Sequence, residues 1–543
     1  MIDPPPKLAD LLKEQGINAP RVHRVLAALA NGAWWSPPEL VRETAVAHRL
    51  VAATLDALAD ELEHRQGNEG LRVRLLRPAD HADSSAPEPA DPVAHLLDRH
   101  TEAAAELDRL VAEAPRSRRD LDHVAATAHT ALRRGVLLAT RYSLPGTRLL
   151  CVGDHDLTAL ATTLVCPGAE AVVVDVDERV LDYIDQAAAR LGLPVRCHFA
   201  DLRLGLPASV RGQCDLAFTD PPYTTEGVEL FVRRGLEGLA DPRRGRVLLA
   251  YGASESTPAL IAKTQSRLAR MNLVFEAVWP EFNRYLGAEA IGAASDLYVL
   301  CPTSRTPAGD ASDTAGRIYS QGGNAKEAAG GLEAPSAAAV LRRVGPDTVV
   351  GAWSREAPPE EGARCARVRL ATWLGSPSRA ERAAVDLTGG WEALLARAIL
   401  AGGSAETHVV VPSGAPQVRD EAGQEALRAM VAPGRDVRFL RGFPDSGHTL
   451  VVARRCEPSD GASPDVRLLA HCQDRAHGVL TSTLREGLIA VAASLGRPVN
   501  KKGARGRVAA AAPWLSGHTL LDLPAHRFPA LGSAAERLVA ELP

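Results

Sequence analysis

The clearest pattern in the chain is a series of short apolar runs between residues 148 and 220, separated by longer amphipathic segments. Each run is followed within two residues by an aspartate. Continuous apolar runs of this length are typical of strands that are buried on both faces of a parallel sheet. The runs that we predict to be strands cover residues 148–152, 171–174, 195–199 and 214–219.

The segments between these runs have helical spacing, and the alternation continues downstream. Strands that alternate with helices form an α/β domain with a mainly parallel sheet. We therefore predict a Rossmann-type catalytic domain over residues 93–302. Its predicted helices cover residues 158–165, 180–191, 227–239 and 258–271, and its later strands cover residues 246–252, 273–278 and 296–301.

A shorter pattern precedes this domain. Helices are predicted at residues 22–30, from Ser36 onward and at residues 47–63, followed by a strand at residues 71–75, which together indicate a winged-helix-like domain over residues 1–80. Residues 21–75 contain seven arginines, no lysine and seven acidic residues. A phosphate-binding face needs clustered positive charge, so we expect a dimerisation or lid element in preference to a DNA-binding module.

The pattern weakens after residue 302. Residues 303–337 are rich in Gly, Ala and Ser and are predicted to be a flexible linker, like the polar, Pro-rich residues 80–92. Residues 338–456 are predicted to form an α/β domain of unknown role, and residues 457–543 a mainly helical region. The predicted strands lie at residues 348–352, 367–374, 408–412 and 449–453, with a helix at residues 391–400.

Two features of this second half have a plain and a functional interpretation. Residues 386–390, Asp-Leu-Thr-Gly-Gly, fit a tight turn better than a degenerate ligand turn, because no acid follows a second strand at the expected spacing. Residues 497–507 are predicted to be a solvated basic loop, with docking of an anionic carrier or a nucleic acid as the alternative.

Composition narrows the classes of protein. The formal net charge is −4, which gives no overall reason to expect a nucleic-acid or membrane partner. The eight cysteines contain no C-x-x-C pair, so we predict no metal site and no disulfide framework. No apolar run reaches membrane-spanning length and the N-terminus does not look like a signal peptide, so we expect a cytoplasmic protein.

The turn after the first strand indicates the charge of the ligand. Gly153 is followed by Asp154, His155 and Asp156, and the G-x-G-x-x-G motif of dinucleotide-binding proteins is missing. The aspartates would repel a pyrophosphate, whereas they would attract a cationic sulfonium nucleoside. We therefore predict S-adenosylmethionine or a relative of it as the co-substrate.

Three further acids complete the predicted nucleoside site. Asp175 ends the second strand about 20 residues after Gly153, where an acid holds ribose hydroxyls, and Asp177 lies beside it. Asp201 follows the third strand, where the adenine amine would be read. Ligands of open α/β sheets bind at this edge, where the carboxyl ends of the strands meet.

The fourth strand ends in Asp220-Pro-Pro-Tyr223, the segment with the clearest chemistry. Two prolines fix the backbone as it leaves the strand, although the tetrapeptide alone is also consistent with a simple turn. We predict that Asp220 orients an acceptor amine and takes its proton, assisted by the Pro221 carbonyl. Tyr223 could stack on the donor cation.

Five motifs occur in an order that resembles the N(4)-bis(aminopropyl)spermidine synthase family, also called branched-chain polyamine synthases, over about residues 15–302. The resemblance implies a winged-helix-like domain before a Rossmann-type domain. It also implies transfer of an aminopropyl group from decarboxylated S-adenosylmethionine to a polyamine nitrogen. The motifs are Gly-Asp-His-Asp-Leu at residues 153–157, Asp-Val-Asp-Glu-Arg at 175–179, Phe-Ala-Asp-Leu-Arg at 199–203, Thr-Asp-Pro-Pro at 219–222 and Phe-Asn-Arg-Tyr at 282–285.

Two departures from the family pattern keep the reaction open. His155 and Tyr223 stand where the family has acids, which weakens the attraction for a polycationic acceptor. Asp-Pro-Pro-Tyr also resembles the motif of many amine and nucleobase methyltransferases. Transfer of a methyl or a 3-amino-3-carboxypropyl group from intact S-adenosylmethionine therefore remains as an alternative, with a nucleic-acid acceptor less favoured than a small molecule.

The remaining site residues are assigned to the acceptor side. Asp154, Asp156, Asn283 and Tyr285 are predicted to line it, and Asp154 is also a candidate catalytic residue. His155 has two interpretations, a titratable relay near the amine or a loop side chain that points into water. Residues 133–135, Arg-Arg-Gly, are interpreted as the cap of a helix in preference to a substrate contact. We expect a small-molecule amine as the partner and a homodimer.

Overall fold

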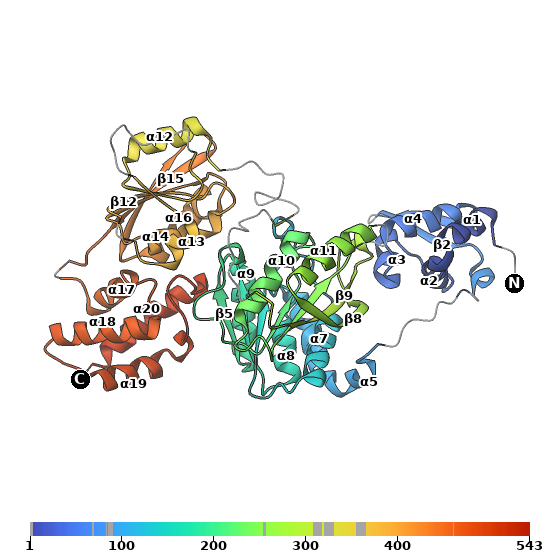
Figure 1. Ribbon diagram of the computed structural model, residues 1–543, viewed down its shortest axis with the longest axis horizontal. Coiled ribbons are helices and arrows are strands. Elements are labelled where there is room, and N and C mark those ends of the chain that lie inside the picture. The colour runs from blue at the N-terminus through green and yellow to red at the C-terminus, as the bar shows by residue number, and fades with distance from the viewer. Residues whose placement is uncertain are drawn as a thin grey trace.

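The computed structural model describes residues 4–67, 70–82, 84, 91–253, 257–307, 318–319, 331–354, 365–378, 380–459 and 461–542. Most of the two predicted linkers, residues 80–92 and 303–337, lies outside the described residues. A central seven-stranded sheet separates the N-terminal helices from a six-stranded sheet and a helical C-terminal region (Figure 1).

The central sheet has the strand order β5-β4-β3-β6-β7-β9-β8. The first five of these strands are parallel, and β9 pairs antiparallel with both β7 and β8. The strand order reverses beside β3, where ligands of open α/β sheets bind. The strands are β3 (Arg148–Val152), β4 (Glu170–Asp175), β5 (Val195–Phe199), β6 (Leu216–Thr219), β7 (Arg246–Tyr251), β8 (Leu273–Arg284) and β9 (Ala294–Pro302).

Helices cover both faces of this sheet (Figure 1). Alternate residues along a strand point to opposite faces, so Cys151 and Phe218 pack into one apolar cluster while Leu150 and Ala217 pack into another. The predicted strands and helices of this region are confirmed, apart from shifts at their ends. The helices are α5 (Ala94–Leu97), α6 (Thr101–Glu113), α7 (Ala128–Arg141), α8 (Thr158–Val165), α9 (Glu178–Leu191), α10 (Thr225–Gly238) and α11 (Pro258–Arg270).

The six-stranded sheet has the order β11-β10-β12-β13-β15-β14. As in the central sheet, the first strands are parallel and the last strand of the chain lies antiparallel between two others. The two sheets thus share one topology, except that the second lacks a counterpart of β5. Its strands are β10 (Thr348–Val350), β11 (Ala366–Val368), β12 (Arg382–Asp386), β13 (Glu406–Pro412), β14 (Arg435–Arg441) and β15 (His448–Arg455).

Two predictions for the second half are wrong in detail. The strand predicted at residues 367–374 ends at Val368 and is followed by a helix whose buried Leu370 and Trp373 face the core, because their spacing also fits one helical turn. The basic loop predicted at residues 497–507 is partly helical, since the Asn500 side chain caps a helix by accepting from Gly503 N–H. The helices of this half are α12 (Ala334–Val344), α13 (Leu370–Gly375), α14 (Leu395–Ala401), α15 (Pro416–Arg419), α16 (Glu421–Val431), α17 (Pro464–Gln473), α18 (Leu480–Ser494), α19 (Lys501–Ala511) and α20 (Phe528–Ala540).

In the described residues of the N-terminal module, four α-helices and a hairpin pack around one apolar cluster. The helix predicted at residues 47–63 is too long, because its last residues begin the first strand of the hairpin and pair with residues of the second. The winged-helix assignment stays a prediction. The elements are α1 (Pro6–Gln15), α2 (Ala19–Leu29), α3 (Pro37–Thr44), α4 (His48–Ala57), β1 (Leu62–Gly67) and β2 (Gly70–Leu75).

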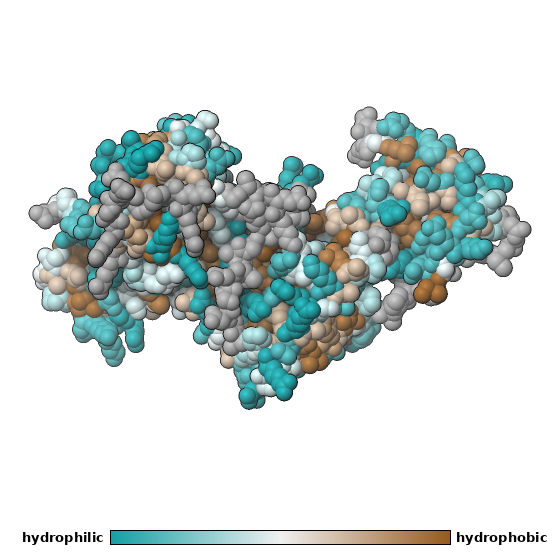
Figure 2. All heavy atoms as spheres, turned by 45° about the horizontal axis from the view of Figure 1, so that its top comes forward, coloured by the Kyte–Doolittle hydropathy of each residue, from teal (hydrophilic) through white to brown (hydrophobic). Residues whose placement is uncertain are grey.

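Hydrophilic and apolar residues are interspersed on the face shown in Figure 2. Exposed large apolar side chains, such as Ile17, Leu76 and Val274, come from separate elements. Within the described part of the chain, no helix is long and apolar enough to cross a membrane.

Candidate functional site

A buried arginine joins the predicted acids at the edge of the central sheet. The Arg134 guanidinium lies 2.6 Å from Asp220 Oδ2 and 2.9 Å from Asp156 Oδ2. Its Nε donates to Asn283 Oδ1 at 2.8 Å. Arg134 lies in the middle of α7, next to Gly135, where a Cβ would stand 2.9 Å from the Ala161 carbonyl oxygen of α8. The two helices thus pack closely, and Arg134 reaches the carboxylates at the edge of the sheet. Because residues 133–135 lie in the middle of α7, their interpretation as a helix cap is wrong.

Two tyrosines hold the Asp220 carboxylate. The Tyr285 hydroxyl donates to Asp220 Oδ2 at 2.7 Å, and the Tyr223 hydroxyl donates to Oδ1 at 3.1 Å. The two hydroxyls lie 2.8 Å apart, and Ser295 Oγ lies 2.7 Å from that of Tyr285. The Tyr223 ring packs edge-on against Tyr251, with ring centroids 5.5 Å apart. Asp220 is therefore fixed in orientation by partners from α7, from the turn after β6 and from the β8–β9 arm.

The pKa values of the two carboxylates beside Arg134 are shifted in opposite directions. Burial and the neighbouring Asp156 raise the pKa of Asp220, although Arg134 opposes this rise. The pKa of Asp156 is lowered: burial works against this, but His155 and Arg134 outweigh it. One guanidinium cannot fully compensate two buried carboxylates, so Asp220 is the group that takes a proton most readily.

His155 lies inside the site and does not point into water. Its side chain is only 14 % exposed and its Nε2 is 3.2 Å from Asp156 Oδ1. The ring stacks on His123 with centroids 4.4 Å apart. Asp156 raises the pKa of His155 against the effect of burial, whereas burial and His155 lower the pKa of His123 to about 3. The pKa values of the two stacked imidazoles are therefore shifted in opposite directions.

The predicted residues of the first turn hold the backbone of the site. Both oxygens of Asp154 accept backbone N–H groups at the start of α8, from Thr158 at 2.8 Å and Ala159 at 2.9 Å. Asp156 Oδ1 accepts from Ala126 N–H at 2.8 Å. Asp175 accepts from the backbone of Asp154 at 3.1 Å through Oδ2, so it fixes the turn beside which Gly153 adopts a positive φ of 70°.

Asp177 and Asp201 line a neighbouring cavity of about 330 Å³ that is bordered by the second half of the chain. Asp177 caps α9 and pairs with Arg179 at 2.6 Å. Asp201 pairs with Arg203 at 2.5 Å. Arg203 also donates to Gly390 O at 2.7 Å, and its guanidinium lies 3.7 Å from the centre of the Trp391 ring. The predicted turn at residues 386–390 thus ends in a contact with Arg203, which follows β5 of the central sheet.

Gly153, His155, Asp175 and Asp220 line one cavity, together with Pro222 and Phe231, whereas Pro221 is not among its lining residues. The cavity measures only about 30 Å³, far below the roughly 300 Å³ of a small-molecule site. Tyr319 borders it and is itself buried, and the carbonyl of the preceding Ile318 accepts from Thr224 Oγ1 at 2.7 Å. A side chain from the predicted linker therefore borders the predicted donor pocket.

Sequence reasoning missed three residues of this site: Arg134, His123 and Tyr319. A buried arginine can be suspected from its position in an otherwise apolar helix face, but its partners lie 22 and 86 residues away in the chain. Nothing local marks His123 or Tyr319.

The fold and the acids at the strand ends define a Rossmann-type domain with a candidate site for a cationic nucleoside. Residues 102–308 match the family model described as the branched-chain polyamine synthase A C-terminal domain. The resemblance to this family is thereby confirmed for the central part of the chain, which is less than half of its length.

Curated relatives match about a third of the chain or less. An N(4)-bis(aminopropyl)spermidine synthase of Thermus thermophilus is 32% identical over 174 residues, which cover 32% of this chain and 45% of the relative. That of Thermococcus kodakarensis is 30% identical over 147 residues, 27% of this chain and 42% of the relative. An uncharacterized protein of Methanocaldococcus jannaschii is 37% identical over 171 residues, 32% of this chain and 43% of the relative. The chain spans less than half the length of these three relatives.

Among solved structures, the chain is similar to the branched-chain polyamine synthase of Thermus thermophilus in complex with N4-aminopropylspermidine and 5′-methylthioadenosine. The TM-score is 0.41 at 23% sequence identity, and the match covers 57% of this chain and 97% of that one.

Proposed function

We propose that this protein is a transferase that moves an aminopropyl group from decarboxylated S-adenosylmethionine to an amine nitrogen of a polyamine. The observation that carries the proposal is Asp220, whose side chain is 10 % exposed and which two tyrosine hydroxyls orient beside Gly153 and Asp175 in one cavity. The names of the curated relatives, N(4)-bis(aminopropyl)spermidine synthases, support the nature of the transferred group and of the acceptor.

The donor side follows from charge and from the turn geometry. The positive φ of Gly153 lets the backbone approach a nucleoside closely, and Asp175 at the end of β4 is placed to accept from ribose hydroxyls. The carboxylates around the cavity would attract a sulfonium cation and repel a pyrophosphate. Asp177 and Asp201, in the neighbouring cavity, would lie farther along the nucleoside.

The reaction is a displacement at carbon. The lone pair of the acceptor nitrogen attacks the methylene carbon bonded to sulfur, the C–S bond breaks, and its electrons stay on sulfur, so that a thioether nucleoside leaves. The nitrogen loses one proton, which Asp220 accepts. Its raised pKa suits this role, because a base works best when its pKa is near the operating pH. Tyr223, Tyr285 and Arg134 hold the carboxylate in line.

One observation favours a second candidate. Tyr223 takes the position where the resembled family has an acid, and its hydroxyl is engaged with Asp220 and Tyr285. The site therefore carries less negative charge than a polycationic acceptor favours. Transfer of a methyl or a 3-amino-3-carboxypropyl group from intact S-adenosylmethionine to a small amine is this second candidate.

The N-terminal module fits a role as a lid or a dimerisation element. Arg24 of α2 makes a bidentate contact with Glu281 of β8, at 2.7 and 3.2 Å. The same strand carries Asn283, and Tyr285 follows it. A change in the position of the module would therefore reach the acceptor side. We expect its deletion to change turnover or oligomeric state, and we expect no sequence-selective binding of duplex DNA.

Mass spectrometry of the products tests the reaction. The purified chain is incubated with decarboxylated S-adenosylmethionine or with S-adenosylmethionine and a panel of amines that includes spermidine. The proposal expects an added aminopropyl group with the decarboxylated donor only. A methyl or aminocarboxypropyl product from the intact donor would establish the second candidate instead, and no transfer to any amine would contradict both.

A further inference from the structure

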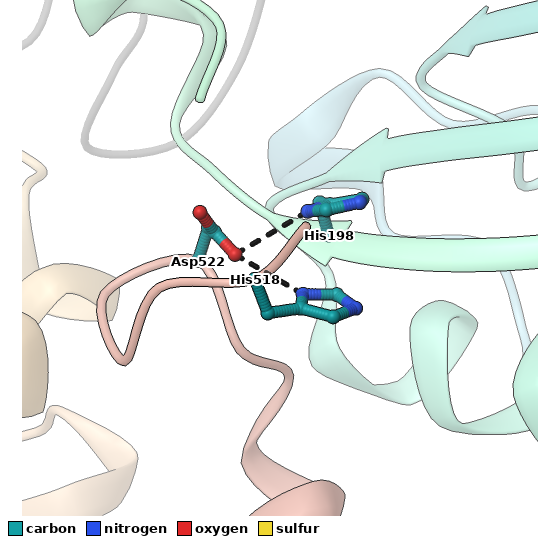
Figure 3. Close-up of side chains that lie close together, drawn as sticks. All are labelled: His198, His518 and Asp522. Carbon is teal, nitrogen blue, oxygen red and sulfur yellow. Dashed lines mark hydrogen bonds and ion pairs between the residues drawn. The ribbon is translucent and has the colours of Figure 1, made fainter. Parts of the chain in front are cut away.

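Two histidines and an aspartate from distant parts of the chain meet at the edge strand of the central sheet. His198 belongs to β5, and His518 and Asp522 belong to the turn that precedes α20 (Figure 3). All three residues are buried, with 3, 5 and 5 % exposure. The proposed transfer reaction uses none of them.

Both imidazoles point at the same carboxylate oxygen. The His198 and His518 Nδ1 atoms lie 3.3 and 3.1 Å from Asp522 Oδ1, and each of the three residues offers a ligand atom within 4.8 Å of the others. N–H···O hydrogen bonds are most often about 2.9–3.0 Å long. Ligand atoms about 2.0–2.1 Å from a tetrahedral zinc ion lie roughly 3.3 Å from one another. Both nitrogen-to-oxygen spacings therefore match the spacing between two ligands of one ion, and the third pair lies within 4.8 Å.

The carboxylate is oriented from its other side. Asp522 Oδ2 accepts from Thr519 Oγ1 at 2.9 Å and from Ser209 Oγ at 3.3 Å, while Thr519 N–H lies 3.1 Å from Oδ1 and 3.3 Å from Oδ2. Carboxylates that bind metals are typically held by such outer hydrogen bonds. Asp522 also lines a cavity of about 210 Å³, which gives an ion a path to the cluster.

We propose that His198, His518 and Asp522 bind one divalent transition-metal ion, with zinc as the ion that two imidazoles and a carboxylate suit. The two Nδ1 atoms and Asp522 Oδ1 are the protein ligands, and water completes the coordination. Bound there, the ion joins the C-terminal region to β5, three residues before Asp201. The site extends the proposed function and does not depend on it.

The same interface contains a matched control. His526 Nε2 lies 2.7 Å from Asp185 Oδ2, so it also pairs an imidazole with a carboxylate across the two regions. There, however, the second partner of the carboxylate is the Arg527 guanidinium at 2.6 Å in place of a second imidazole. A cation in this position excludes a metal ion.

Metal titration of the full-length chain tests the proposal. After removal of metal with a chelator, the protein competes for Zn²⁺ with a chromophoric chelator. We expect one Zn²⁺ per chain, bound at least about 100-fold more weakly in His518→Gln, because a ligand is lost, and unchanged in His526→Gln. Equal binding by the wild type and His518→Gln would overturn the proposal and leave a hydrogen-bonded interface.

Cobalt provides a second measurement that needs no variant. Co²⁺ added to the wild-type chain should give the intense visible absorption of a tetrahedral site, and Zn²⁺ should displace it. This result is expected whether or not His518→Gln folds. A spectrum of hydrated Co²⁺ only would contradict the site.

Discussion

The two sheets of this protein share strand order and strand direction but differ where the carboxyl ends of their strands meet. In the central sheet, β4 ends in Asp175 and β6 leads into Asp220. At the corresponding places of the second sheet, Arg369 follows β11 and β12 ends in Asp386. The same backbone frame therefore carries two acids at these places in the central sheet, and an arginine and one acid in the second sheet. We expect these side chains, and not the shared fold, to decide what each sheet binds.

In the second sheet, Asp386 at the end of β12 stabilises the turn that follows the strand. Asp386 accepts from the backbone and hydroxyl of Thr388, at 2.9 and 2.6 Å, and a Cβ on Gly331 would stand 2.6 Å from its Oδ2. Chain from residues 303–337 thus packs against the edges of both sheets, through Tyr319 at the first and through Gly331 at the second. The cavity at the first edge is lined by several acids.

Removing the buried arginine should have the largest effect on stability. Arg134→Met leaves Asp156 and Asp220 without their shared cation, so we expect a loss of about 3–5 kcal/mol in the free energy of unfolding. Arg141→Met is the control on the same helix, because its ion pair with Glu276 is about 30% exposed and should contribute under about 1 kcal/mol. Urea denaturation measures both, and equal losses would refute a special role of Arg134.

Asp220→Asn should remove most turnover while keeping donor affinity. The amide fills the same volume but cannot accept the proton, so we expect a fall in kcat on the order of 10² or more. Asp386→Asn, at the corresponding strand of the second sheet, should leave kcat near that of the wild type. Steady-state kinetics decide this, and a comparable fall in both variants would break the distinction between the sheets.

The dependence of kcat on pH should also report the Asp220 carboxylate as the base. Burial and Asp156 raise the pKa of Asp220, and the ionised form accepts the proton, so activity is present above this pKa and is lost as the pH falls through it. We expect kcat to fall by about tenfold per pH unit below a pKa higher than the ordinary 3.9 of an aspartate. The acidic limb should vanish from the residual activity of Asp220→Asn. An acidic limb at an ordinary carboxyl pKa would argue for another group.

Shortening Tyr319 should have a smaller effect, in the opposite direction. The side chain borders the predicted donor cavity, which measures about 30 Å³, and we expect it to move when a nucleoside enters. Tyr319→Ala should strengthen donor binding by several-fold, on the order of tenfold at most, because less of the population is in a closed form. Tyr319→Phe keeps the ring and should bind like the wild type. Weaker binding by Tyr319→Ala in calorimetry would mean that the ring contacts the donor.

The sequence was informative where local patterns decide the structure. Apolar runs followed by acids predicted the strands of the central sheet and placed Gly153, Asp175 and Asp220 around one pocket. The contact of Arg134 with Asp220 was not predictable, because the two residues lie 86 positions apart in the chain. Tyr285 was expected at the acceptor side, and it contacts Asp220. The topology of the second sheet was hidden for another reason: β10 and β11 have only three residues each, too few to show periodicity.

The cluster of His198, His518 and Asp522 was also not predictable, because its members are far apart in the chain. The expectation of no metal site rested on the spacing of neighbouring cysteines, whereas these three residues lie 324 positions apart at their widest. Only the docking of the C-terminal region on β5 brings them together.

Calorimetric titration of the full-length chain with decarboxylated S-adenosylmethionine tests most directly whether one sheet, and not two, binds the donor. We predict one nucleoside per chain. Asp175→Ala should weaken binding by a factor of tens, because the ribose loses charge-assisted hydrogen bonds of roughly 1.5–3 kcal/mol, and Arg369→Ala should leave it unchanged. Two nucleosides per chain, or unchanged affinity in Asp175→Ala, would contradict the account.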